Sequence, residues 1–86
     1  MPEISRFFGI IVAMFYNDHA PPHFHARYGD YKVEVAIDSL GVIAGNFPPR
    51  VLGLLIEWAA LHRAELFEDW ELARRHAALK NIPPLE

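Results

Sequence analysis

A two-residue Gly-Asp loop between two strand-like runs is the feature that most restricts how this chain can fold. The segment Tyr28-Gly29-Asp30-Tyr31 is typical of a type II′ β-hairpin turn. Such a turn fixes the register of the two strands and gathers apolar side chains on one face of the hairpin. The predicted apolar pairs are Tyr28 with Tyr31, Ala26 with Val33, and Phe24 with Val35.

The other face of this hairpin is predicted to be polar. Its pairs are His23 with Ala36, His25 with Glu34, and Arg27 with Lys32. The pairing of His25 with Glu34 is favourable, whereas the two cations Arg27 and Lys32 are in mild conflict. Because alternate residues of a strand share a face, His23 and His25 are expected to project from the same side.

Strand-like segments on both sides extend the hairpin into an antiparallel sheet of about four strands. The run Phe7–Tyr16 is apolar, β-branched and aromatic without alternation, which favours one strand covered on both faces. After a type I turn at Asp38–Gly41, the segment Val42–Phe47 is expected to form the fourth strand.

Helices are expected after the strands. Pro48-Pro49 marks a helix start, and an apolar stripe at helical spacing continues to about Leu79. Because so long a helix is unusual in a small domain, we expect a kink between His62 and Glu65. The order predicts a single α+β domain over residues 1–86, with strands within 7–47, helices within 48–79 packed on one face of the sheet, and an extended tail over 80–86.

Composition narrows the classes of function. The 86 residues include no cysteine, so any metal site has to use imidazole and carboxylate ligands. The net charge of −3 gives no general attraction to RNA. RNA is therefore a possible partner that the charge of the chain does not support. The longest apolar run is too short to cross a bilayer, and no signal-peptide pattern is evident. We therefore expect a cytoplasmic protein without a membrane partner.

The segment Asn17–His25 is the strongest functional signal. It holds three of the five histidines and an aspartate, on a loop stiffened by Pro21-Pro22. The candidate ligands of a divalent metal, with zinc considered first, are Asp18, His19, His23 and His25. The candidate catalytic residues for acid–base chemistry are Asp18, His19, His25 and Glu34. The alternative is a solvated sheet face on which Asp18 only caps a turn.

His62 is a separate candidate in the helical stripe, three residues before Glu65. It is either a further ligand or base oriented by that carboxylate, or a half-buried histidine with one hydrogen bond. Because the helix is expected on the apolar face of the hairpin, His62 should lie across the sheet from His23 and His25. We therefore do not expect His62 to join them within one subunit.

The chain resembles the bacterial domain-of-unknown-function family 4160. The resemblance is carried by the segments Met1–Ile10, Asn17–His25, Glu57–Leu66 and Trp70-Glu71. It implies a small uncharacterised protein, often encoded beside another short protein in an arrangement similar to toxin–antitoxin operons. It assigns no catalytic residues.

Two functions follow from these observations. The first is a toxin–antitoxin-type module that works through contact with a co-encoded small protein. In this hypothesis the partner, or a second copy in a homodimer, supplies the missing cover of the first strand. The alternative is a metal- or histidine-dependent hydrolase, for example an RNase, that uses the Asn17–His25 cluster to activate water or to transfer protons.

Overall fold

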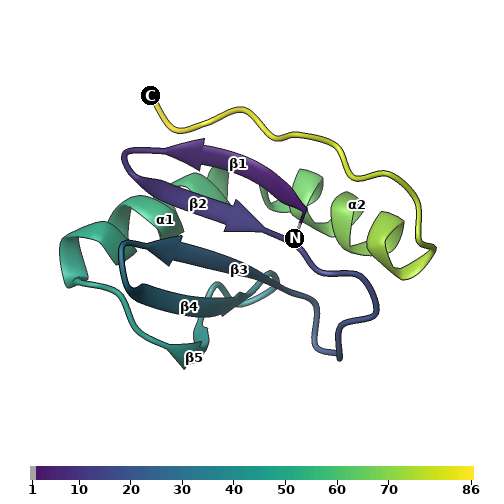
Figure 1. Cartoon of the computed structure of the whole chain (residues 1–86), viewed down its shortest axis with the longest axis horizontal. Coiled ribbons are helices and arrows are strands. Elements are labelled where there is room, and N and C mark those ends of the chain that lie inside the picture. Colours follow the sequence, from purple (N-terminus) through teal and green to yellow (C-terminus); the bar gives the residue numbers. More distant parts are fainter. Residues whose placement is uncertain (1) are drawn as a thin grey trace.

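A computed structural model describes residues 2–86 and shows a five-stranded antiparallel sheet with two helices on one face (Figure 1). The elements are β1 (Glu3–Phe7), β2 (Ile10–Ala13), β3 (His23–Tyr28), β4 (Tyr31–Ala36), β5 (Val42–Gly45), α1 (Pro49–Leu61) and α2 (Arg63–Arg74). The strands lie in the sheet in chain order, so each pairs with the strand before it. The predicted α+β class is confirmed, with one more strand than expected. No helix within residues 2–86 is long and apolar enough to cross a membrane.

The β3–β4 hairpin has the register predicted from the Gly-Asp turn. His25 lies opposite Glu34 and Arg27 opposite Lys32. Gly29 has a φ of 58°, which the first central position of a type II′ turn requires. Four residues of the apolar face are buried in the core, Phe24, Ala26, Val33 and Val35, whereas Tyr31 beside the turn is 46% exposed. The register set by this turn therefore determines which side chains face the helices.

The expectation of a single strand over Phe7–Tyr16 is wrong. Phe8 and Gly9 have φ values of 48° and 80°, the pair of left-handed conformations that makes a type I′ turn. The run is thus divided between the end of β1 and the whole of β2. The sequence predicts that a partner or second copy covers the outer face of this strand. Ile11 and Phe15 are only half-buried, so the strand is not covered on both faces and this argument for a partner is lost.

The long helical pattern is broken at His62, within the predicted interval. His62 (φ −122°, ψ 27°) separates α1 from α2. The helix ends at Arg74 and not near Leu79, because the left-handed His76 (φ 56°) turns the chain. The amide of Ala77 then donates to the Leu72 carbonyl at 2.9 Å, as in a Schellman closure.

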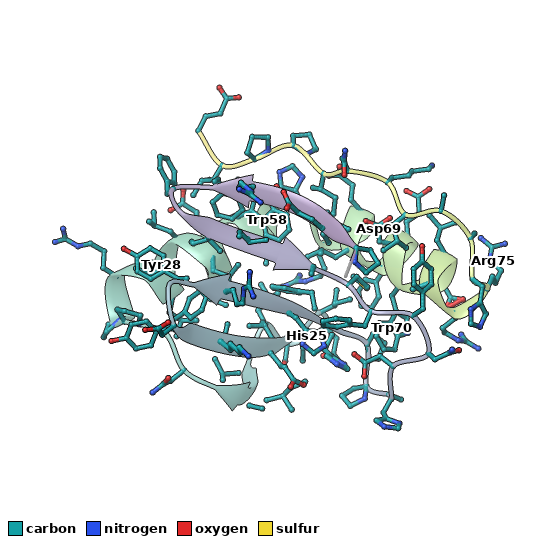
Figure 2. All side chains as sticks on the ribbon, in the orientation of Figure 1. His25, Tyr28, Trp58, Asp69, Trp70 and Arg75 are labelled. Atoms are coloured by element: carbon teal, nitrogen blue, oxygen red, sulfur yellow. The ribbon has the colours of Figure 1, made fainter. Side chains whose placement is uncertain are left out.

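Trp58 of α1 joins the helix, the sheet and the C-terminal tail (Figure 2). Its side chain is fully buried, with ring centroids 5.2 Å from Phe7 and 5.9 Å from Phe24. Its indole N–H donates to the Pro83 carbonyl at 2.8 Å. The tail passes along β1 (Figure 1), where the Ile82 amide donates to a carbonyl of that strand at 2.8 Å.

Gly45 lies where β5 approaches the backbone of β4 most closely. Its φ is 77°, and a Cβ added there would lie 2.1 Å from the Lys32 carbonyl oxygen. A left-handed conformation alone costs a non-glycine residue about 1–2 kcal/mol. Because the added Cβ would also clash, we expect Gly45→Ala to lower the free energy of unfolding by more than this. Gly53→Ala is the matched control, because a Cβ at Gly53 in α1 would meet no other atom. This substitution should raise the free energy of unfolding by about 1 kcal/mol. Urea unfolding measures both, and unchanged stability in Gly45→Ala would contradict this packing.

Asp69 of α2 is a buried acid that holds the tail. Its side chain is 1% exposed, and Oδ1 accepts the Lys80 amide at 2.9 Å. Oδ2 has no hydrogen-bond partner within the part of the chain that the structure describes. Burial raises the pKa of the Asp69 carboxyl, and the hydrogen bond from Lys80 offsets this only in part.

Asp69 should make the fold less stable as the pH rises. Since its pKa is higher in the folded chain, the folded state keeps the proton longer. The stabilisation is complete below the unfolded-state pKa, about 4, and is lost as the pH rises through the folded-state value. We expect Asp69→Asn to gain stability relative to the native chain across this interval, as measured by urea unfolding at several pH values. A difference that does not change with pH would contradict the buried-acid interpretation.

Candidate metal centre

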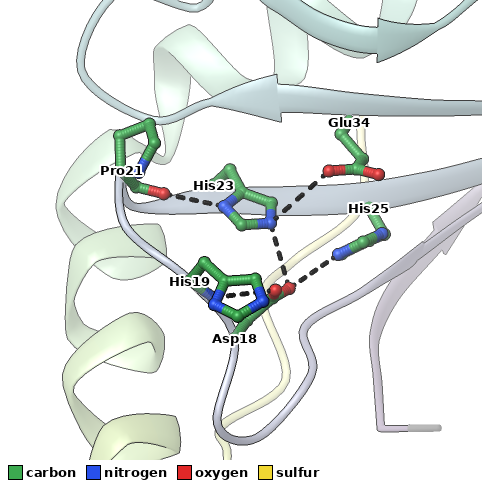
Figure 3. A network of polar contacts seen from close by, with 6 residues as sticks. All are labelled: Asp18, His19, Pro21, His23, His25 and Glu34. Carbon is green, nitrogen blue, oxygen red and sulfur yellow. Dashed lines mark hydrogen bonds and ion pairs between the residues drawn. The ribbon is translucent and has the colours of Figure 1, made fainter.

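Asp18, His23 and His25 converge at the end of the sheet where β3 begins (Figure 3). Nε2 of His23 lies 3.0 Å from Oδ2 of Asp18, and Nε2 of His25 lies 2.9 Å from the same oxygen. One potential ligand atom from each residue lies within 4.8 Å of the other two. Two imidazoles therefore share one carboxylate oxygen.

A strand and a folded-back loop bring these side chains together. His23 and His25 alternate along β3 and so share a face. The loop before β3 turns at Asn17, which has a left-handed φ of 61°, and contains a cis peptide bond between Ala20 and Pro21. The His19 amide donates to Oδ1 of Asp18 at 2.9 Å. This hydrogen bond leaves Oδ2 of Asp18 directed at the two imidazoles (Figure 3).

The backbone sets the orientation of the His23 ring. Its Nδ1 lies 2.7 Å from the Pro21 carbonyl oxygen, which can only accept, so Nδ1 carries a proton. The Nε2 of a neutral His23 then presents a lone pair to the Asp18 carboxylate. Two acceptors at that distance need either a proton or a cation between them. A backbone carbonyl that accepts from the far ring nitrogen is the usual support of a metal-binding histidine.

Aromatic side chains enclose the cluster on two sides. His23 is 5% exposed, and its ring centroid lies 5.3 Å from that of Trp70 on α2. The Phe15 ring meets His25 edge to face, with centroids 4.3 Å apart. The His25 and Asp18 side chains remain 25% and 19% exposed. A ligand therefore reaches the cluster from the His25 side, while His23 is closed off.

Asp18 is held as a carboxylate. Partial burial alone raises its pKa, but hydrogen bonds from His25 and from the His19 amide act in the opposite direction. Attraction between the Asp18 carboxylate and the charged forms of His23 and His25 lowers the pKa further. The pKa of Asp18 is therefore lowered overall. A negative oxygen between two imidazoles is a donor set suited to a divalent cation.

Two other predicted site residues lie at the margin of the cluster. Glu34 is opposite His25 in the sheet, as predicted. Asp18 already occupies Nε2 of His25, and Oε1 of Glu34 instead lies 3.7 Å from Nε2 of His23. His19 supplies its backbone amide, and its imidazole is outside the group of converging ligand atoms found among residues 2–86.

His62 is apart from this cluster, as expected from the packing of the helices. It lies between α1 and α2, where its Nδ1 donates to the Glu65 carboxylate and its ring centroid is 5.7 Å from Trp58. Within the described part of the chain it is not a member of the converging group. The single hydrogen bond and partial burial match the structural alternative for His62.

The spacing of the ligand atoms is that of a hydrogen-bonded network that can open to receive an ion. In tetrahedral zinc with bonds of about 2.0–2.1 Å, neighbouring ligand atoms lie about 3.3–3.4 Å apart. The Nε2–Oδ2 distances of 2.9 and 3.0 Å are a few tenths of an ångström shorter. Small side-chain rotations would supply this difference. Two histidines and a carboxylate also match the ligand set of many zinc sites that keep one position open.

Fold and site define an α+β domain with a His/His/Asp cluster at one end of its sheet. The chain belongs to the family described as Domain of unknown function (DUF4160), which matches residues 9–71. That range includes the whole cluster. No curated protein and no solved structure gives a significant match.

Proposed function

We propose that this protein binds a divalent metal through Asp18, His23 and His25 and uses the ion in hydrolysis. The observation that supports this most directly is the convergence of two Nε2 atoms on one oxygen of Asp18. The Pro21 carbonyl gives further support, because it orients His23 in advance. Zinc is the first expectation, since the donors are imidazole and carboxylate.

The number of ligands supports a hydrolytic role. Three protein ligands leave a position for water on a tetrahedral ion, and zinc lowers the pKa of such a water to about 7. The partial exposure of His25 supports access of a substrate to that position. Glu34 is the candidate base, because its carboxylate is 37% exposed beside the cluster. An RNase is one hydrolase of this type.

Calorimetric titration of untagged protein tests the metal-binding step. We expect Zn²⁺ to bind with one ion per chain, and Ni²⁺ and Mn²⁺ are titrated alongside for comparison. Hydrolysis of phosphate esters and of RNA is then followed before and after removal of the metal with a chelator. Failure to bind any of these ions stoichiometrically would overturn the proposal, and activity unaffected by the chelator would overturn its hydrolytic part.

A second candidate, the toxin–antitoxin-type module, is supported by the exposed edge of the sheet at β5. Every residue of β5 is exposed, and Val42 and Ile43 remain 44% and 47% exposed. The opposite edge, β1, is accompanied by the C-terminal tail. An apolar edge strand with free backbone groups is suited to pairing with a strand of another protein. We propose the co-encoded small protein as this partner, with a homodimer as the alternative.

Co-expression with the neighbouring gene product tests the module. We expect the two proteins to elute together, and Ile43→Lys to reduce their association. Elution of the native chain alone as a monomer would contradict a partner at β5, whereas a dimer of this chain would identify a second copy.

The cytoplasmic location expected from the sequence stays a proposal, which cell fractionation tests.

A further inference from the structure

Two cations face each other on the hairpin without an acidic partner. Arg27 of β3 lies directly opposite Lys32 of β4, an arrangement that is unfavourable unless an anion is shared. Three other exposed cations are paired, Arg6 with Glu3, Arg74 with Glu71, and Lys80 with Glu68. Arg50, Arg63 and Arg75 also lack an acidic partner in the described part of the chain, but they do not face a second cation across a strand pair. No ion pair within residues 2–86 involves Arg27 or Lys32.

This cation pair lies in one hollow with His25, one of the three proposed metal ligands. Arg27 follows His25 by two residues on β3, so they share a face at a spacing of about 7 Å along the strand. A hollow of about 200 Å³ is lined by Arg27, Lys32, His25 and Glu34 together. Ile11 and Ala44 add apolar surface to it. Of the three proposed ligands only His25 lines this hollow, so a small molecule bound there would contact the cations and the His25 side of the cluster.

We propose that Arg27 and Lys32 bind a phosphate group and that the substrate of the metal centre is a small phosphate ester. A guanidinium and an ammonium group are the side chains that most often hold phosphate. The apolar part of the hollow would accept the organic group. Its volume is below the 300–1,000 Å³ common for ligand sites, which suits a small ester or one nucleotide of a strand. This inference rests on the proposed function.

The surrounding charges make the site selective. The chain carries a net charge of −3, so attraction of an anion is local to this pair. Glu34 also lines the hollow and repels phosphate. A divalent ion on the adjoining cluster offsets this repulsion. We therefore expect phosphate to bind more tightly to zinc-loaded protein than to protein kept metal-free with a chelator.

Titration with inorganic phosphate, adenosine monophosphate and a short single-stranded oligoribonucleotide tests the subsite. In metal-free protein we expect the double variant Arg27→Ala/Lys32→Ala to bind about tenfold more weakly or worse, because two charge-assisted contacts are lost. The matched control Arg50→Ala/Lys80→Ala removes the same charge outside the hollow and should bind like the native chain. Glu34→Gln should bind phosphate more tightly.

Zinc titration of the same double variant separates the two proposals. We expect its zinc affinity to be unchanged, because neither cation is a ligand. Two outcomes would overturn the substrate inference and leave the metal site standing. In the first, zinc binds but none of the three phosphate compounds does. In the second, both double variants lose affinity for phosphate equally. If the phosphate compounds bind as expected and zinc does not, the proposed function fails alone. Binding of the oligonucleotide but not of the free compounds would overturn the small-ester assignment in favour of a polynucleotide.

Discussion

Replacement of His23 by alanine is expected to weaken zinc binding by more than about 100-fold. Loss of a supporting residue around a metal site already lowers affinity by about 10–100-fold, and loss of a ligand is more severe. His23 is buried against Trp70 and fixed by the Pro21 carbonyl, so no mobile side chain can easily take its place. Competition titration with a chromogenic chelator measures the affinity.

Three further variants make this result specific. Asp18→Asn keeps the shape of the side chain and removes the charge, and should also lose affinity. His19→Ala and His76→Ala each remove a histidine whose imidazole is outside the cluster, and should bind zinc like the native chain. Circular dichroism confirms that each variant is folded. Native affinity in both His23→Ala and Asp18→Asn would exclude these residues as ligands.

Replacement of Trp58 by alanine is expected to lower the free energy of unfolding by about 3–5 kcal/mol. This is a large part of the about 5–15 kcal/mol that stabilises a folded domain. Trp58 is fully buried and packs against Phe7 and Phe24, so its truncation would leave a cavity in the core. Urea unfolding followed by circular dichroism measures the loss.

Trp58→Phe is the informative comparison. It keeps an aromatic ring in the core but removes the indole N–H that donates to the Pro83 carbonyl. We expect an intermediate loss of stability and faster amide hydrogen exchange in the tail around Ile82. A loss below about 1 kcal/mol in Trp58→Ala would contradict its central place in the core.

The hairpin could be predicted in full because its signal is local. Gly29 permits the left-handed conformation of the turn, and the side-chain alternation of the two strands agrees with the register that the turn imposes. The first hairpin carried a weaker signal. Its turn places Phe8, a bulky residue, at a φ of 48°, and only Gly9 indicated a turn. The end of α2 was missed for the same reason, since His76 adopts a left-handed conformation that favours glycine.

The candidate site could be predicted only in part. Strand alternation places His23 and His25 side by side. Whether Asp18 or His19 turns toward them depends on the backbone of the loop, which the sequence does not determine. The role of Pro21 had no sequence signal, because it acts through a backbone carbonyl. Trp70 had only a helical spacing typical of a core residue, which cannot reveal that its ring covers His23.

A crystal structure of zinc-loaded protein, with anomalous data at the zinc absorption edge, tests the central claim most directly. We predict one ion bonded to Nε2 of His23, Nε2 of His25 and a carboxylate oxygen of Asp18, at about 2.0–2.2 Å. The distances between these ligand atoms should have widened to accommodate it. No anomalous peak at the cluster, with Nε2–Oδ2 distances still at 2.9–3.0 Å, would contradict the metal centre.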